Sequence, residues 1–85
     1  MKSVEIYTTP ICGYCAMAKR LLDQKGVEYT EINVMGDMEA MTTMIQRANG
    51  GRTVPQIFVG DMHVGGSDDL HALERAGKLD HLLAA

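Results

Sequence analysis

Apolar and polar residues alternate along this chain with two different periods, and the period changes from segment to segment. Alternation at every second position predicts four strands, at residues 3–8, 28–34, 56–59 and 62–64. Apolar positions spaced three and four apart predict helices at 13–25, 38–48 and 68–76, with a short helical turn at 79–83. Gly60 and Asp61 lie between the last two strands, which indicates a hairpin turn there.

The second and third predicted helices carry capping residues at their starts. Asp37 is the expected N-cap of the second helix, and Ser67 is the expected N-cap of the third. Asp68 and Asp69 fall in the first turn of the third helix, where carboxylates interact favourably with the helix dipole. The apolar stripe expected to bury the second helix consists of Met38, Met41, Ile45 and Ala48.

The predicted elements follow the order β-α-β-α-β-β-α, which restricts the possible folds. Two strands joined through a helix form a parallel pair with a right-handed crossover, whereas a hairpin is antiparallel. We therefore expect an α/β protein with a thioredoxin-like fold: a four-stranded mixed sheet with helices on both faces, in a single domain spanning residues 1–85. A ferredoxin-like arrangement is disfavoured because it needs a β-β pair in the middle of the chain.

Composition removes several classes of function. The 85 residues are 46% hydrophobic and 22% charged with a net charge of -3, and they contain no cluster of Lys and Arg that would bind nucleic acid. No apolar stretch approaches the length of a membrane span, and Glu5 interrupts the first apolar residues, so no secretory signal is expected. Only two cysteines occur, three residues apart, which indicates a reducing, cytoplasmic compartment and cysteines kept for reactivity.

The cysteine pair lies between the first predicted strand and the first predicted helix. Cys12 just precedes the helix, where free backbone N–H groups stabilise a thiolate, the attacking form of cysteine. Cys15 lies one turn later on the apolar face, within reach of Cys12 for a disulfide. A zinc site would need two further ligands, and His63, His71 and His81 lack metal-ligand spacing. The pair therefore predicts redox chemistry.

Four segments follow one another along the chain: Ile6-Tyr7-Thr8, Cys12-Gly13-Tyr14-Cys15, Thr53-Val54-Pro55 and Gly65-Gly66-Ser67-Asp68-Asp69-Leu70. In this order and spacing they resemble the small bacterial dithiol glutaredoxins. The resemblance implies a glutathione-dependent disulfide oxidoreductase that reduces protein–glutathione mixed disulfides and protein disulfides. It implies that Cys12 is the nucleophile and Cys15 the resolving cysteine, and that glutathione is a co-substrate with no tightly bound cofactor. We expect the protein to be a monomer.

The same resemblance implies a glutathione site. A cis Val54–Pro55 peptide bond is expected, which leaves the Val54 backbone free to pair with a peptide-like ligand. The third helix start would take the γ-glutamyl carboxylate, with Asp68 on the ammonium group and Asp69 as the alternative. Arg52 is expected at the glycyl carboxylate. The predicted contacts are Tyr14, Arg52, Thr53, Val54, Pro55, Gly66, Ser67 and Asp68.

The chain departs from the family pattern at two positions and leaves two alternatives open. Thr9 stands where relatives often have Lys, and Gly13 replaces the usual Pro, so the turn at the cysteines is expected to be more flexible. The Thr8-Thr9-Pro10 segment also resembles glutaredoxin-like redoxins that are reduced by thioredoxin reductase. The second alternative is a [2Fe–2S] cluster held by a dimer through Cys12 and glutathione; no other metal site is predicted.

Overall fold

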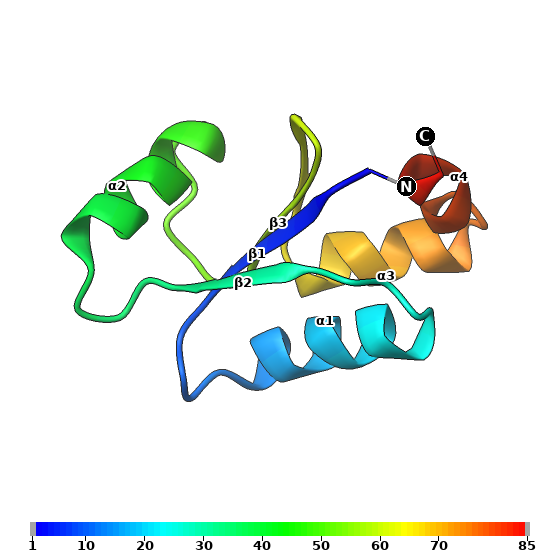
Figure 1. Cartoon of the computed structure of the whole chain (residues 1–85), viewed down its shortest axis with the longest axis horizontal. Coiled ribbons are helices and arrows are strands. Elements are labelled where there is room, and N and C mark those ends of the chain that lie inside the picture. The colour runs from blue at the N-terminus through cyan, green and yellow to red at the C-terminus, as the bar shows by residue number, and fades with distance from the viewer. Residues whose placement is uncertain (1, 85) are drawn as a thin grey trace.

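A computed structural model describes residues 2–84 and contains a four-stranded sheet flanked by helices (Figure 1). The strand order is β2-β1-β3-β4; β1 pairs in parallel with β2 and antiparallel with β3, and β3 pairs antiparallel with β4. In chain order the elements are β1 (Val4–Thr8), α1 (Gly13–Gln24), β2 (Thr30–Asn33), α2 (Met38–Arg47), β3 (Gln56–Val59), β4 (Met62–Gly65), α3 (Ser67–Arg75) and α4 (Leu79–Leu83).

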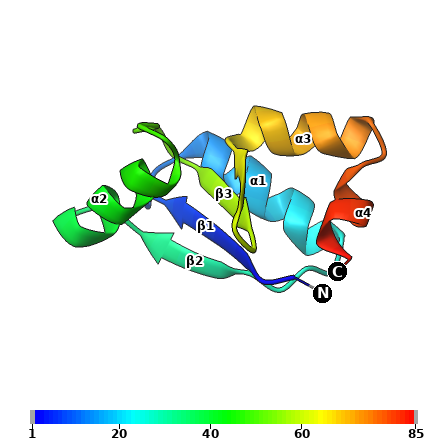
Figure 2. The ribbon, with the colours of Figure 1, turned by 90° about the horizontal axis from the view of Figure 1, so that it is seen from above.

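Helices cover both faces of this sheet. Figures 1 and 2 show α1 and α3 side by side against one face, α4 at the end of that layer, and α2 against the other face. The thioredoxin-like fold expected from the order of elements is confirmed. The predicted second strand was too long at both ends, since regular pairing in β2 is limited to Thr30–Asn33.

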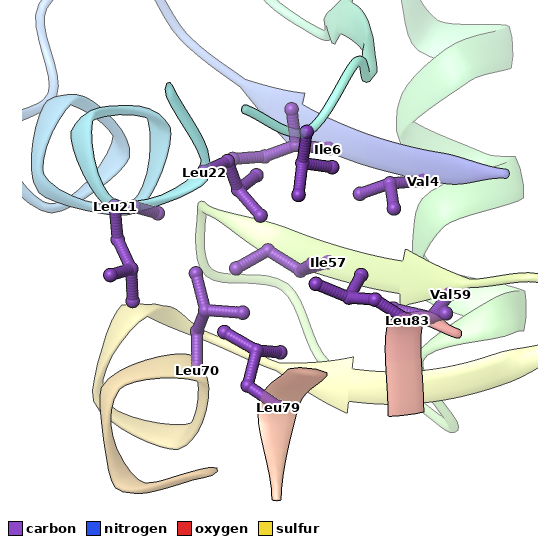
Figure 3. Packing of buried hydrophobic residues seen from close by; sticks show 11 residues of the cluster. Val4, Ile6, Leu21, Leu22, Ile57, Val59, Leu70, Leu79 and Leu83 are labelled. Atoms are coloured by element: carbon purple, nitrogen blue, oxygen red, sulfur yellow. The ribbon is translucent and has the colours of Figure 1, made fainter. Parts of the chain in front are cut away.

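The face that packs against α1 and α3 holds the larger core. Aliphatic side chains from both layers meet there (Figure 3), and Ile6, Leu22, Ile57 and Leu70 are fully buried. Burying one such side chain contributes about 1.5–3 kcal/mol to folding. This core fixes α1 and α3 against the same strands, and so it fixes the positions of their N-termini relative to each other.

The α2 face holds a smaller core of different composition. Tyr7 and Phe58 meet edge to face with ring centroids 5.7 Å apart, and Met44 of α2 is fully buried beside them. Asp37 caps α2 as predicted, because its Oδ1 accepts the Ala40 N–H at 2.9 Å. The predicted apolar stripe was wrong at its first member: Met38 is 84% exposed, since the first turn of α2 projects beyond the sheet.

The ends of α1 follow from its sequence. The helix starts after Cys12, directly beyond the C-terminal end of β1, and it ends at Gln24. Gly26 follows with a φ of +68°, a left-handed conformation that glycine adopts without the steric cost of a side chain. Among residues 2–84, no helix is long and apolar enough to cross a membrane.

Candidate active site

Cys12 is the N-cap of α1, so the reactive sulfur is itself the capping atom. Its backbone is extended (φ -149°, ψ 107°), and its Sγ accepts a hydrogen bond from the Cys15 N–H at 3.1 Å. The Cys15 N–H is one of the first N–H groups of the helix, which have no acceptor within the helix itself. The sulfur of the predicted nucleophile therefore lies at the N-terminus of α1, where it accepts a bond from the backbone.

Cys15 has the opposite environment, although it lies only three residues further along α1. Its side chain is 1% exposed. Burial, and next the hydrogen bond with Cys12, raise the pKa of the Cys15 thiol to about 11, while the Thr9 backbone and Lys19 act to lower it. Both cysteines are free thiols in this structure. Cys15 therefore stays protonated at neutral pH while Cys12 is unmodified. This suits a resolving cysteine, which attacks only after the first cysteine has formed a disulfide.

The segment Thr53-Val54-Pro55 comes close to Cys12 from the other side. The expected cis Val54–Pro55 peptide bond is confirmed. The Cys12 thiol lies 3.9 Å from the Val54 carbonyl oxygen, to which it donates a weak hydrogen bond. Residues separated by more than forty positions are thereby brought together at one sulfur atom.

The start of α3 provides the facing segment, and here one prediction was wrong. The N-cap of α3 is Gly66, and Ser67 is the first helical residue, with only 4% of its surface exposed. Asp69 supplies the cap instead, because its Oδ2 accepts the Gly66 N–H at 3.0 Å. Asp69 is therefore occupied within the helix start, whereas the exposed Asp68 is the acidic side chain left to meet a ligand.

A groove with a volume of about 510 Å³ runs between these two segments. Cys12 does not line it, but the Cys12 sulfur lies 3.9 Å from the carbonyl oxygen of Val54, which does. Figure 2 shows that α1 and α3 both start on the side of the molecule nearer α2 and end on the side nearer α4. Arg52 directly precedes one wall and is exposed, so its place at a ligand stays a prediction. The lining residues are Tyr14, Thr53, Val54, Pro55, Gln56, His63, Gly65, Gly66, Ser67, Asp68 and Asp69.

Sequence reasoning missed Gln56 and His63 as members of this groove. Both are strand residues, on β3 and β4, and polar residues of a hairpin ordinarily face solvent. Gln56 is in fact 5% exposed and bonded to His63. Phe58 is the partner of His63 across the hairpin, and Gln56 lies two residues before Phe58. The signal available in the sequence was therefore only two polar residues at diagonal positions of a hairpin, near the Gly-Gly segment.

Comparison with known proteins gives a consistent result. Residues 4–64 match the Glutaredoxin family model. The chain is 56% identical over 85 residues to a glutaredoxin of Pseudomonas aeruginosa, covering 100% of both chains. It is similar to a buckwheat glutaredoxin–glutathione complex, with a TM-score of 0.86, 33% identity and coverage of 96% of this chain and 76% of that one.

A further structure is similar and is described as "Metal Binding of Glutaredoxins". It has a TM-score of 0.75 and 55% identity, with coverage of 98% of this chain and 89% of that one. The reactive cysteine at a helix start, the buried second cysteine and the family match all agree. The chain belongs to the glutaredoxin family of thiol–disulfide oxidoreductases.

Proposed function

We propose that this protein is a glutathione-dependent oxidoreductase that reduces protein–glutathione mixed disulfides and some protein disulfides. The observation that carries the proposal is the groove of about 510 Å³ beside the Cys12 sulfur. Its two walls have the chemistry that glutathione needs, and the similar buckwheat protein is described as a complex with glutathione.

Each wall would bind a different part of the tripeptide. The Val54 backbone would pair with the cysteinyl residue in the manner of an added strand, with Tyr14 as an apolar side wall. The Gly66 N–H is taken by Asp69, so the N–H groups of Ser67 and Asp68 at the start of α3 would meet the γ-glutamyl carboxylate. Asp68 is free to meet the ammonium group, and Arg52 would meet the glycyl carboxylate.

The reaction proceeds by two thiol–disulfide exchanges. The Cys12 thiolate attacks the glutathione sulfur of a mixed disulfide, a bond forms between these two sulfurs, and the substrate protein leaves as a thiolate. A second glutathione thiolate then attacks the glutathione sulfur, which releases Cys12 and forms oxidised glutathione. On a protein disulfide, the Cys12 thiolate attacks one substrate sulfur and the other leaves as a thiolate. Cys15 then loses its proton to solvent and attacks the Cys12 sulfur, which breaks the bond to the substrate, releases the reduced protein and closes the internal disulfide. Two glutathione molecules reduce that disulfide by the same exchange and leave as oxidised glutathione.

The assay that tests this proposal compares two electron donors. Turnover of a glutathionylated peptide is measured with glutathione and glutathione reductase, and in parallel with thioredoxin reductase and no glutathione. We expect turnover only with glutathione. Turnover with thioredoxin reductase alone would instead identify a glutaredoxin-like redoxin and contradict the proposal.

A second candidate function is a [2Fe–2S] cluster shared by two copies of the chain, and the similar structure described as metal-binding supports testing it. Within residues 2–84, no group of three His, Cys, Asp or Glu side chains could hold a metal ion, so one chain alone does not fit a cluster. Two copies would have to contribute Cys12 together with two glutathiones. Anaerobic reconstitution with iron, sulfide and glutathione decides it: a colourless monomer excludes this function.

The proposed enzyme is a monomer in the cytoplasm, with residues 1–85 acting as one domain. Two closely spaced free cysteines suit a reducing compartment, where structural disulfides do not persist. Sedimentation of the reduced protein is expected to give the mass of one 9.3 kDa chain. A mass of two chains without any cluster would contradict the monomer.

A further inference from the structure

Gln56 is a buried polar side chain whose hydrogen bonds run in one direction. Its Nε2 donates to the Thr53 carbonyl oxygen at 3.0 Å and approaches Thr53 Oγ1 at 3.4 Å, and its Oε1 lies 2.7 Å from His63 Nε2. A carbonyl oxygen can only accept, so the amide nitrogen must face Thr53 and the amide oxygen must face His63. His63 therefore donates from Nε2, and the chain of bonds runs from His63 through Gln56 to Thr53.

His63 is held by stacking as well as by this hydrogen bond. Its ring stacks on Phe58, its partner across the hairpin, with centroids 5.0 Å apart and an angle of 24° between the planes. Phe58 is itself buried, and the Arg47 guanidinium lies 4.1 Å from its ring centroid. Arg47 is fixed in turn by Glu5 at 3.0 Å. The position of the His63 ring, and with it the donor nitrogen, is thus fixed by packing on the sheet face that α2 covers.

These bonds join the two walls of the groove. Thr53 opens the first wall, which continues through Val54 and Pro55. His63 lies on β4 two residues before Gly65, where the second wall begins. The β3–β4 ladder joins the two strands, with Ile57 opposite Gly65. The bonds between Thr53, Gln56 and His63 extend this connection beyond the ladder, to the loop before β3.

We propose that the Gln56–His63 pair is a positioning device that fixes the separation of the two walls and so sets the affinity of the groove for the glutathionyl group. This inference rests on the proposed function, because only a ligand that contacts both walls at once is sensitive to their separation. Neither side chain contacts the Cys12 sulfur, so the chemistry at that atom does not depend on the pair.

A matched set of variants at His63 separates the hydrogen bond from the stacking. His63→Phe keeps an aromatic ring on Phe58 but removes the donor, which leaves the buried Gln56 oxygen without a partner. His63→Gln restores a donor at the place of Nε2. His81→Phe, at an exposed histidine of α4, controls for loss of a histidine elsewhere.

The readouts are KM and kcat for a glutathionylated peptide, and the rate at which iodoacetamide modifies Cys12. For His63→Phe we expect KM to rise about five- to tenfold, kcat to stay within about twofold and the alkylation rate to be unchanged. His63→Gln should return KM to within about twofold of the wild type. Alkylation needs no glutathione site, so a general loss of structure would change it whereas a displaced wall does not.

A second variant tests the other half of the pair and covers the case in which His63→Phe does not fold. Gln56→Glu still accepts from His63, but a carboxylate cannot donate to the Thr53 carbonyl and repels it, so KM should rise at least as much. A wild-type KM in both variants, or a His63→Gln as impaired as His63→Phe, would overturn the inference. A wild-type protein with no glutathione-dependent turnover would instead refute the proposed function, which keeps the two failures distinct.

Discussion

Two helix N-termini meet at one groove, and they are capped in opposite ways. At α1 the cap is the sulfur of Cys12, which accepts a helix N–H and is the proposed nucleophile. At α3 the Asp69 carboxylate reaches back from inside the helix to the Gly66 N–H, and the residue before the helix makes no side-chain bond to the N–H groups of the first turn. Under the proposed function, the α1 terminus would supply the reacting atom and the α3 terminus would bind the ligand.

The largest effect should come from replacing the sulfur atom that caps α1 with oxygen. Cys12→Ser retains a hydrogen-bond acceptor at the helix start but cannot exchange with a disulfide, so turnover of a glutathionylated peptide should fall by more than about 1,000-fold. Cys15→Ser is the matched control and should keep this turnover while losing reduction of protein disulfides. If both variants were equally inactive, the route through Cys12 and glutathione alone would be wrong.

The difference between the two cysteines of α1 should also appear in their alkylation. Because burial and the bond with Cys12 raise the pKa of Cys15 to about 11, very little of it is thiolate at pH 8. Iodoacetamide at pH 8 should therefore give a single adduct on Cys12 in the native protein, and two adducts after unfolding in urea. Mass spectrometry of the peptides checks this, and a native adduct on Cys15 would show that the residue is not shielded.

At α3, removing a binding carboxylate should affect affinity rather than chemistry. Asp68→Ala should raise KM for a glutathionylated peptide by about ten- to a hundredfold with kcat little changed, since a charge-assisted hydrogen bond contributes about 1.5–3 kcal/mol. Asp61→Ala, in the β3–β4 turn, makes the same change of charge away from the groove and should leave KM unaltered. Equal kinetics for the two variants would mean that Asp68 only favours the helix dipole.

The smallest effect should be the loss of the α3 cap itself. Asp69→Ala removes the 3.0 Å bond to the Gly66 N–H and should lower the free energy of unfolding by about 0.5–2 kcal/mol. Urea unfolding measures this change, with Asp68→Ala as the neighbouring control that keeps the cap. If Asp68→Ala were the more destabilising of the two, the assignment of the cap to Asp69 would be incorrect.

The strands and helices of this fold were predicted well from the sequence, because the residues buried in the larger core recur at regular strand and helix spacings. Ile6 and Leu22 fall at strand and helix spacing, and both are fully buried. Cys12 could be placed at a helix start because Pro10 and Gly13 bound the turn before α1. Local patterns along the chain were therefore enough to place Cys12 at the helix start and Cys15 on its buried face.

The wrong N-cap of α3 and the missed groove residues both occur where more than one local arrangement fits the sequence. Ser67 follows two glycines and has a strong N-cap propensity, but Asp69 can reach the Gly66 N–H one residue earlier, and Ser67 is then drawn into the buried side of the helix. Gln56 and His63 were missed because their bond depends on the register of β3 against β4, which includes an irregularity between Ile57 and Phe58. Periodicity alone carries no information on that register.

The position of β1 has a consequence for how the protein is made. β1 is the first strand to be synthesised, yet it lies inside the sheet, between β2 and β3. A chain that emerges N-terminus first can pair β1 with β2 and form α1 once residues 30–33 are available, but β3 and the start of α3 arrive much later. Until then the chain lacks residues 53–55 and 65–69, which form the two walls of the groove. Under the proposed function, both cysteines are therefore synthesised well before the segments that would bind glutathione.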